Sequence, residues 1–387
     1  MRKKSVAEKF FWSQEKEMVK HRIAVIPGDG IGPEVIREGV KVLEAVSKNL
    51  GGITFEFSYF PWGCEYYLKN GQMMPQDGLE KLKNFEAIYL GAIGDPKVPD
   101  HISLRDLLLK IRFGFDQYVN LRPVKLLESI PCPLKNKKPE DIDLVVVREN
   151  TEGFYTGIGG RHKKGDSKHA IYAKINKVFA DSEEIVTQEG VFSQIGVERI
   201  MKYSFKLARK RKKHLTCCTK SNALNYSMVY WDEIFKKISG QYPDVKTDFA
   251  FVDAICMWFI KNPEFFDVIV APNLFGDIIT DLGAMIQGGM GLAPGGNINP
   301  HGISMFEPIH GSAPKYTGKN VADPIATIWA GQMMLEELGE KKAASMIMKA
   351  IKKVLKNGKV RTKDLGGTSA TSEVGNAIVE SIFKDVT

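Results

Sequence analysis

The chain has 387 residues, of which 43% are hydrophobic and 26% are charged, an ordinary balance for a globular protein. Disordered chains, collagen and disulfide-stapled miniproteins are thereby excluded, and the length suffices for two or three domains. A formal net charge of +8 admits nucleic acid, a membrane surface or an anionic small molecule as a partner. Apolar runs stay below the roughly 18 residues of a membrane span, so no membrane partner is expected.

The first 20 residues, MRKKSVAEKFFWSQEKEMVK, are predicted to form an N-terminal extension (1–20) that is helical or mobile. This segment lacks the apolar core and the cleavage site of a signal peptide, and its glutamates disfavour an organelle-targeting peptide. The 5 cysteines are an odd number without CxxC spacing, which argues against a disulfide framework or a zinc site. A reducing compartment, the cytoplasm, is therefore expected.

Strand and helix patterns alternate from residue 21 onward, which is typical of an α/β protein with a largely parallel sheet. Short apolar runs predict strands at 22–27, 86–94, 141–150, 214–221 and 266–273, and helical spacing predicts a helix at 33–50. Gly28, Gly30 and Gly32 lie between the first strand and this helix and predict a tight turn with an exposed backbone. Pro33 stands where a GxGxxG fingerprint needs its last glycine, which disfavours ordinary Rossmann binding.

The segment NLFGDIITD places Asp277 and Asp281 where an apolar strand gives way to a helix. Residues four apart share a helix face, so these two carboxylates repel each other and need a compensating cation. Mg²⁺ or Mn²⁺, which prefer oxygen ligands, would supply that charge. The alternative is that Asp277 caps the helix and Asp281 is solvated.

Three arginines supply the opposite charge. Arg112, Arg122 and Arg148 fall at strand ends or in polar breaks of apolar segments. Guanidinium groups match carboxylates bidentately, so the three would suit a di- or tricarboxylate if they converge, whereas each alone would be a surface ion-pair partner. Tyr155 and Lys220 are candidates for a catalytic acid and base.

Seven motifs occur in order: IPGDGIGPEV, NLRPV, VVRENTEGFYTG, TKSN, VDA, NLFGDIITDLG and EPIHGSAP. Together they resemble the metal-dependent β-decarboxylating dehydrogenases, the family of isocitrate, 3-isopropylmalate, homoisocitrate and tartrate/D-malate dehydrogenases. The match runs from about residue 21 to the C-terminus. The intervening segments WGCEYYLKNGQMMP and DPIATIWAGQMML are most similar to the tartrate/D-malate branch.

This resemblance implies an isopropylmalate-dehydrogenase-like α/β fold. A large cofactor-binding domain would comprise residues 21–117 and 273–387, and a smaller central α/β domain with a dimer-forming arm would comprise 118–272. The implied assembly is a homodimer whose active sites are shared between the subunits.

The resemblance also implies the reaction, in which a 2-hydroxy di-acid passes a hydride to NAD(P) and loses CO₂ with the help of Mn²⁺ or Mg²⁺. The matching site residues are the substrate-binding Arg112, Arg122 and Arg148, the acid Tyr155, the base Lys220, and the metal ligands Asp253, Asp277 and Asp281. Lys220 and Asp253 are expected to reach the site from the partner subunit. The implied cofactor contacts are Glu307, His310, Gly311, Ser312, Ala313, Lys315, Tyr316, Ala322 and Asp323.

Two departures from the family pattern bear on specificity. Lys315 and Tyr316 stand where the tartrate/D-malate branch has an Asp for the adenosine ribose, as in NADP-using isocitrate dehydrogenases. Ala322 resembles the NAD branch, and the C-terminal segment lacks the Tyr and Arg that hold a 2′-phosphate, so NAD is favoured and NADP remains possible. Asp106 and Leu108 replace the Ser and Asn of the isocitrate branch, so isocitrate is not expected.

D-Malate or tartrate is the substrate that the resemblance favours. The run Leu107–Leu109 would form an apolar wall able to accept an isopropyl group, which keeps 3-isopropylmalate dehydrogenase, an enzyme of leucine biosynthesis, as an alternative. A catalytically inactive regulatory paralogue is a further alternative, although the motif residues for chemistry are retained. The basic run at 206–213 lacks interleaved aromatics and is interpreted as a solvated helix end, so no nucleic-acid partner is expected.

Overall fold

The computed structural model describes residues 18–384. Most of the expected extension (1–20) lies outside the described residues, and its last two residues belong to the first strand, which begins at Val19. Among the described residues, no helix is long and apolar enough to cross a membrane.

The expected alternation of strands and helices is confirmed, with strand ends that differ from the predicted ones by at most three residues. The strands are β1 Val19–Gly28, β2 Ile53–Tyr59, β3 Ala87–Ala92, β4 Val119–Lys125, β5 Asp143–Glu149, β6 Gly159–Lys163, β7 Glu184–Gln188, β8 His214–Thr219, β9 Lys246–Phe251, β10 Val268–Ala271, β11 Pro294–Ile298 and β12 Ser304–Pro308. The α-helices are α1 Gly32–Leu50, α2 Cys64–Asn70, α3 Gly78–Leu82, α4 Asp100–Ser103, α5 Lys110–Gly114, α6 Ser167–Tyr172, α7 Lys177–Asp181, α8 Gln194–Lys210, α9 Ser227–Ser239, α10 Val252–Lys261, α11 Asn273–Ile286, α12 Ile325–Glu337, α13 Lys341–Asn357 and α14 Thr371–Lys384.

Ten strands form one sheet in the order β2-β1-β3-β12-β11-β4-β5-β10-β8-β9. The flanking strands pair in parallel, whereas β12, β11, β4 and β5 pair antiparallel in the middle. The expectation of a largely parallel sheet is thus confirmed, with an antiparallel centre that joins its two halves. Parallel strands are buried on both faces and read as continuous apolar runs, which is why β3 and β10 were visible in the sequence.

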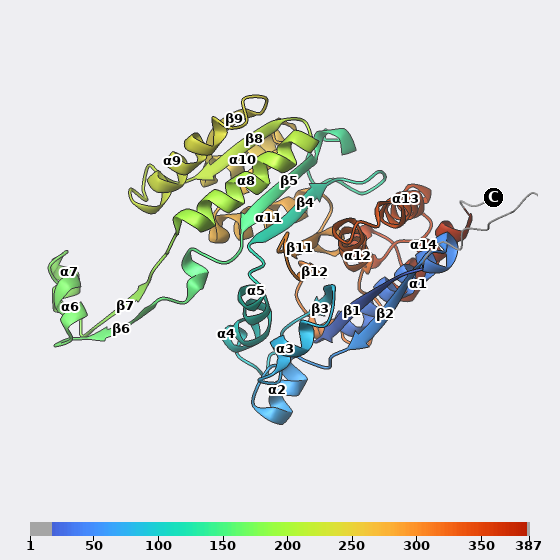
Figure 1. The fold of residues 1–387 in the computed structure, drawn as a ribbon, viewed down its shortest axis with the longest axis horizontal. Coiled ribbons are helices and arrows are strands. Elements are labelled where there is room, and N and C mark those ends of the chain that lie inside the picture. Colours follow the sequence, from blue (N-terminus) through green and yellow to red (C-terminus); the bar gives the residue numbers. More distant parts are fainter. Residues whose placement is uncertain (1–17, 385–387) are drawn as a thin grey trace, which may run out of the picture.

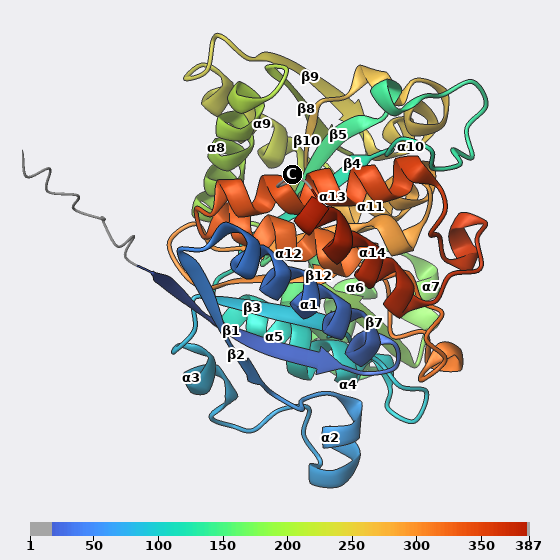
Figure 2. The same cartoon turned by 90° about the vertical axis from the view of Figure 1, so that its right-hand side faces the viewer.

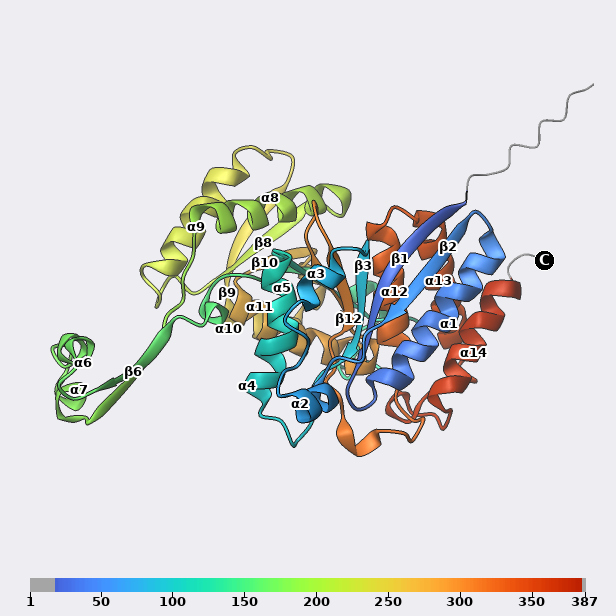
Figure 3. The same cartoon turned by 60° about the horizontal axis from the view of Figure 1, so that its bottom comes forward.

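Helices cover both faces of each half of the sheet. In the half that contains β1, the helices α1, α12, α13 and α14 pack together on one side, and α2 to α5 lie on the other (Figures 2 and 3). In the half that contains β9, helices α8 and α9 lie opposite α10 and α11. The division into a large and a small domain stays a prediction. That division assigns α11 to the large domain, although α11 packs on β4, β5 and α10, which it assigns to the small domain.

An arm protrudes from the half that contains β8 to β10. It consists of the antiparallel pair β6 and β7 with the short helices α6 and α7 at its end (Figures 1 and 3). Apolar side chains on the arm are exposed, among them Ile171, Ile175, Val178 and Val186, at 61 to 71%. An arm of this kind exposes apolar surface that a single chain leaves uncovered.

The glycine turn after β1 packs against the loop that follows β12. Gly28 and Gly30 adopt φ values of 71° and 60°, the left-handed region that favours glycine. A Cβ on Gly30 would lie 2.0 Å from the carbonyl oxygen of Ser312, to which the Ile31 N–H donates over 2.8 Å. The expectation of an exposed turn is therefore wrong at Gly30, because the loop at Ser312 covers it.

The basic run at 206–213 closes helix α8 and is tied down by ion pairs. Arg211 Nε donates to Asp267 over 2.7 Å and its Nη2 to Asp143 over 3.0 Å, and Arg209 pairs with Asp244. The expected helix end is confirmed. Arg209 and Arg211 are not simply solvated, because they form ion pairs with aspartates at the starts of neighbouring strands. Cys217 and Cys218 are buried free thiols on β8.

Candidate active site

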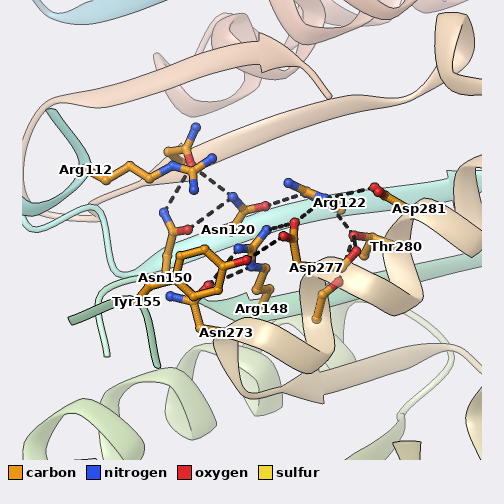
Figure 4. A network of polar contacts seen from close by, with 12 residues as sticks. Arg112, Asn120, Arg122, Arg148, Asn150, Tyr155, Asn273, Asp277, Thr280 and Asp281 are labelled. Atoms are coloured by element: carbon orange, nitrogen blue, oxygen red, sulfur yellow. Dashed lines mark hydrogen bonds and ion pairs between the residues drawn. The ribbon is translucent and has the colours of Figure 1, made fainter. Parts of the chain in front are cut away.

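Three buried arginines line one cleft between the two halves of the sheet. Arg112 on α5, Arg122 on β4 and Arg148 at the end of β5 are only 4%, 7% and 1% exposed. They line a cleft of about 300 Å³ together with Tyr155 and Asp277 (Figure 4). Arginines are rarely buried without partners, so this convergence marks a place built for negative charge.

Arg148 is held by side chains from the start of helix α11. Its Nε and Nη2 both donate to Asn273 Oδ1, over 2.9 and 2.7 Å, and its Nη1 donates to Asp277. Burial and the nearby Arg122 lower the pKa of Arg148 to about 9, and burial also lowers the pKa of Arg122. Both groups remain protonated at neutral pH, so an additional anion in the cleft would be stabilised there.

Asp277 and Asp281 lie one turn apart on α11, on the face that meets Arg122. Arg122 Nη1 lies 3.4 Å from Asp277 Oδ1 and 3.7 Å from Asp281 Oδ1. Burial raises the pKa of Asp277, but Arg148 and Arg122 outweigh it, so this pKa lies below its usual value. Burial raises the pKa of Asp281, whose side chain is 61% exposed. The alternative of Asp277 as helix cap is wrong, because Pro272 occupies the cap position.

Tyr155 lies on a single 3-10 turn, Phe154–Thr156, that follows β5. Its hydroxyl donates to Asp277 Oδ2 over 2.8 Å, and the Arg148 guanidinium carbon lies 5.4 Å from the centre of its ring. Burial and the charge of Asp277 raise the pKa of Tyr155. The phenol therefore keeps its proton at neutral pH.

Lys220 and Asp253 lie apart from this cluster. They follow β8 and begin α10, and Lys220 Nζ donates to Asp253 Oδ1 over 2.7 Å. Neither residue lines the arginine cleft. Within residues 18–384, no group of three or more His, Cys, Asp or Glu side chains is placed to hold a metal ion. The chain thus brings Asp277 and Asp281 together but leaves Asp253 elsewhere.

The predicted cofactor residues occupy the loop after β12 and its surroundings. His310 and Gly311 line the cleft, and Glu307 lies beneath Arg112, whose Nη2 donates to Glu307 Oε1 over 3.0 Å. Two buried atoms near this loop lack partners, His310 Nε2 and Asp323 Oδ2. Of the other residues, Ser312 is buried, Ala313 and Ala322 are half-buried, and Lys315 and Tyr316 are exposed.

Sequence reasoning missed the buried amides beneath the arginines. Asn120, Asn150 and Asn297 are at most 1% exposed, and Asn273 and Thr280 contact Arg148 and Arg122 directly. The available signal was the position of Asn120 and Asn150 inside or beside apolar strands, in the motifs NLRP and VVREN. A buried amide must find hydrogen-bond partners, so each such position indicates a polar network.

The expected apolar wall is only partly correct. Residues Leu104–Leu109 form a π-helical stretch between α4 and α5. Leu104 and Leu108 line the cleft, whereas Leu107 packs in a core cluster with Ile111 and is fully buried. Successive residues of a helix point in different directions, so a run of three adjacent leucines does not share one face.

Comparisons with known proteins identify the family to which this architecture belongs. The family model described as isocitrate/isopropylmalate dehydrogenase matches residues 22–378. The chain belongs to this family. A solved isocitrate dehydrogenase from Methylococcus capsulatus superposes with a TM-score of 0.81 at 34% identity, covering 94% of this chain and 99% of that one. The expected isopropylmalate-dehydrogenase-like fold is thereby confirmed.

Within the isocitrate/isopropylmalate dehydrogenase family, tartrate and D-malate enzymes are close relatives. The D-malate dehydrogenase [decarboxylating] of Escherichia coli K12 is 49% identical over 373 residues, or 94% of this chain and 99% of that protein. The tartrate dehydrogenase/decarboxylase of Pseudomonas putida is 49% identical over 375 residues, or 94% and 98% of the two chains. The predicted resemblance to the tartrate/D-malate branch is confirmed.

Proposed function

We propose that this protein catalyses the oxidative decarboxylation of a 2-hydroxy di-acid, D-malate or tartrate, with NAD as hydride acceptor and Mn²⁺ or Mg²⁺ as the metal. The observation that carries the proposal is the convergence of Arg112, Arg122 and Arg148 in one cleft with Tyr155 and Asp277. The relatives named for D-malate and tartrate support this choice of substrate.

The arginines account for recognition of a di-acid. Arg148 and Arg122 lose hydration on burial, and their charges repel each other. A substrate carboxylate bound between them would stabilise both charges in place of the lost water. Arg112 approaches from α5, on another side of the cleft. Guanidinium groups from separate elements suit two carboxylates of one small molecule.

Asp277 and Asp281 would hold the divalent metal. Two carboxylates one turn apart, one of them 61% exposed, offer the hard oxygen donors that Mg²⁺ and Mn²⁺ select. When bound, the metal would polarise the substrate's 2-oxygen and stabilise negative charge that develops on it. Asp253 of the partner subunit would be a third ligand, because Asp253 of the same chain does not line the cleft that contains Asp277.

Tyr155 and Lys220 would manage the protons. Lys220 of the partner subunit would take the proton from the substrate's 2-hydroxyl as the hydride leaves for the nicotinamide. Tyr155 retains its hydroxyl proton at neutral pH and holds it at Asp277 Oδ2, so it would protonate the carbon from which CO₂ departs. Arg148 beside the phenol ring would favour the transient phenolate.

The loop from Glu307 to Tyr316 would bind the adenosine part of the cofactor. The unpartnered buried atoms His310 Nε2 and Asp323 Oδ2 fit a polar base, because buried polar groups without partners cost free energy. Lys315 and Tyr316 would lie near the ribose, with NAD preferred and NADP accepted.

A homodimer with shared sites would complete the enzyme. Exposed apolar residues on α10 and α11, including Met257, Ile260, Ile278 and Met285 at 51 to 64%, and those on the arm support such a contact.

Mixing of two inactive variants, Asp253→Asn and Asp277→Asn, would test whether the subunits share their active sites. Random reassortment should restore about a quarter of wild-type activity, because half of the dimers would then carry one intact site of two. No recovery in demonstrably mixed dimers would contradict the sharing of sites.

An assay of D-malate, tartrate, 3-isopropylmalate and isocitrate, each with NAD or NADP and with Mn²⁺ or Mg²⁺, would test the substrate. We expect turnover of D-malate or tartrate. 3-Isopropylmalate remains the second candidate because Leu104 and Leu108 line the cleft. Absence of NAD(P)H formation with all four acids would favour the inactive regulatory paralogue and refute the proposed function.

A further inference from the structure

A chain of buried hydrogen bonds links two of the cleft arginines, Arg112 and Arg122. Figure 4 shows both arginines with Asn120 and Asn150 between them. Arg112 Nη2 donates to Glu307 Oε1 over 3.0 Å, and Asn297 Nδ2 donates to the same oxygen over 2.7 Å. Asn297 Oδ1 accepts from Asn120 Nδ2 over 2.9 Å, and Asn120 Oδ1 accepts from Arg122 Nε over 2.9 Å. Each link therefore has a donor, an acceptor and an ordinary length.

Asn150 closes the amide cluster from the third side. Its Nδ2 donates to Asn297 Oδ1 over 3.0 Å and to the Gln117 carbonyl over 2.8 Å, and its Oδ1 accepts from Asn120 Nδ2 over 3.2 Å. The three amides are at most 1% exposed. Each of them makes bonds to two others or to fixed backbone, so the cluster has little freedom to rearrange.

The two ends of the chain impose one direction on its hydrogen bonds. Arginine only donates hydrogen bonds, and an ionised carboxylate only accepts them. Arg122 therefore requires the oxygen of Asn120, and Glu307 requires the amide nitrogen of Asn297. Reversing either amide would place two donors or two acceptors together, so only one arrangement satisfies every group.

The backbone sets this chain across three neighbouring strands. Asn120 and Asn297 are opposite each other in the β4–β11 pair, and β11 pairs in turn with β12, which carries Glu307. Arg112 comes from α5 on a separate segment. Asn297 is thus the residue through which the position of Arg112 is tied to that of Arg122.

We propose that Asn297 is a positioning residue that fixes the separation of Arg112 and Arg122, and with it the length of di-acid that the cleft accepts. This inference rests on the proposed function, because it assumes that the two arginines bind two carboxylates of one molecule. A merely structural role would lower stability and weaken all ligands alike. A positioning role changes the preference among ligands.

Calorimetric titration with malonate, succinate and glutarate, in the presence of Mg²⁺, would separate these roles without any turnover. The wild type should prefer succinate, which has the four-carbon length of malate, by at least about tenfold over the others. In Asn297→Asp, a carboxylate oxygen replaces the donor that faces Glu307 Oε1, so two acceptors repel each other there and the preference should shrink by at least about tenfold.

Asn297→Ala, which also lacks the donor, serves if Asn297→Asp does not fold. Gln287→Glu is the matched control, a fully buried amide that bonds Lys125 N and the Leu292 carbonyl away from the cleft, and it should lower the melting temperature without changing the preference.

Three outcomes would overturn the inference. If the wild type binds none of the three di-acids, the proposed function fails and this inference fails with it. A wild type that binds them without length preference, or an Asn297→Asp variant that keeps the wild-type preference, refutes only the positioning role.

Discussion

Replacement of Asp277 by Asn removes one negative charge from the centre of the cleft while it keeps the shape of the side chain. Asp277 lies between Arg148 and Arg122 and accepts from Tyr155, and its side chain is 36% exposed. Loss of a fully buried ion-pair partner costs about 3–5 kcal/mol, whereas exposed pairs contribute about 0–1 kcal/mol. For this half-exposed group we expect a loss of about 1–3 kcal/mol in the free energy of unfolding.

The effect on catalysis should be much larger than the effect on stability. With one of the two proposed same-chain metal ligands gone, kcat/KM should fall by at least about a hundredfold, and higher Mn²⁺ concentrations should recover only part of it. The measurements are NADH formation against Mn²⁺ concentration and a thermal melt of each variant. Asp143→Asn is the matched control, since it breaks ion pairs with Lys125 and Arg211 outside the cleft. Full wild-type activity after exhaustive chelation, or unchanged metal dependence in Asp277→Asn, would refute the assignment.

Two further predictions concern proton transfer and acid stability. Tyr155→Phe should slow the steps after hydride transfer, whereas Lys220→Met should slow hydride transfer itself. A substrate deuterated at C2 should therefore show a large isotope effect on turnover only in Lys220→Met. Equal isotope effects in the two variants would contradict the proposed roles of Tyr155 and Lys220. For Asp143, burial raises the pKa but Lys125 and Arg211 outweigh it, so the folded-state pKa lies below the unfolded value of about 3.9. The ionised Asp143 therefore stabilises the folded state above about pH 4, and this stabilisation is lost as the pH falls through the folded-state pKa. The urea unfolding midpoints of the wild type and Asp143→Asn should converge at low pH. A difference between the midpoints that stays constant with pH would show that the charge of Asp143 contributes nothing to stability.

The sequence predicted those parts of the site whose chemistry is readable from residue type. Charged residues within apolar segments, such as Arg148 after VVV and Asp277 after NLFG, need buried partners, and the structure brings these two together. Periodicity indicated the strands and the shared face of Asp277 and Asp281 for the same local reason.

The remaining features depend on contacts between distant segments. Asn297 meets Asn120 only because β11 pairs antiparallel with β4, and no local pattern encodes that pairing. Leu107 does not line the cleft, because adjacent residues of a helix point in different directions and only Leu108 of the three faces it. The sequence also gave no sign that Glu307, placed in the cofactor loop by its motif, would pair with Arg112.

In the proposed cofactor site, the choice between NAD and NADP would depend on Lys315, whose ammonium lies 4.9 Å from the centre of the Tyr316 ring. A charge-assisted contact with a 2′-phosphate contributes about 1.5–3 kcal/mol when desolvated. Lys315 is exposed, so solvent reduces that gain, and leaving the ring costs about 0.5–1 kcal/mol more. The net attraction of about 1 kcal/mol corresponds to roughly fivefold in affinity, too little to exclude NAD.

We therefore expect the wild type to use both cofactors, with NAD moderately preferred. Lys315→Asp should remove the residual NADP activity, because a carboxylate repels the phosphate, and should lower the KM for NAD, because it accepts hydrogen bonds from the ribose hydroxyls. Lys315→Gln is the matched control, because it removes the attraction for the 2′-phosphate without adding repulsion. Its NADP activity should lie between those of the wild type and Lys315→Asp. If the wild type favours NADP by more than about a hundredfold, or about 2.7 kcal/mol, then Lys315 and Tyr316 contribute far more than this exposed geometry allows, and the preference for NAD is wrong.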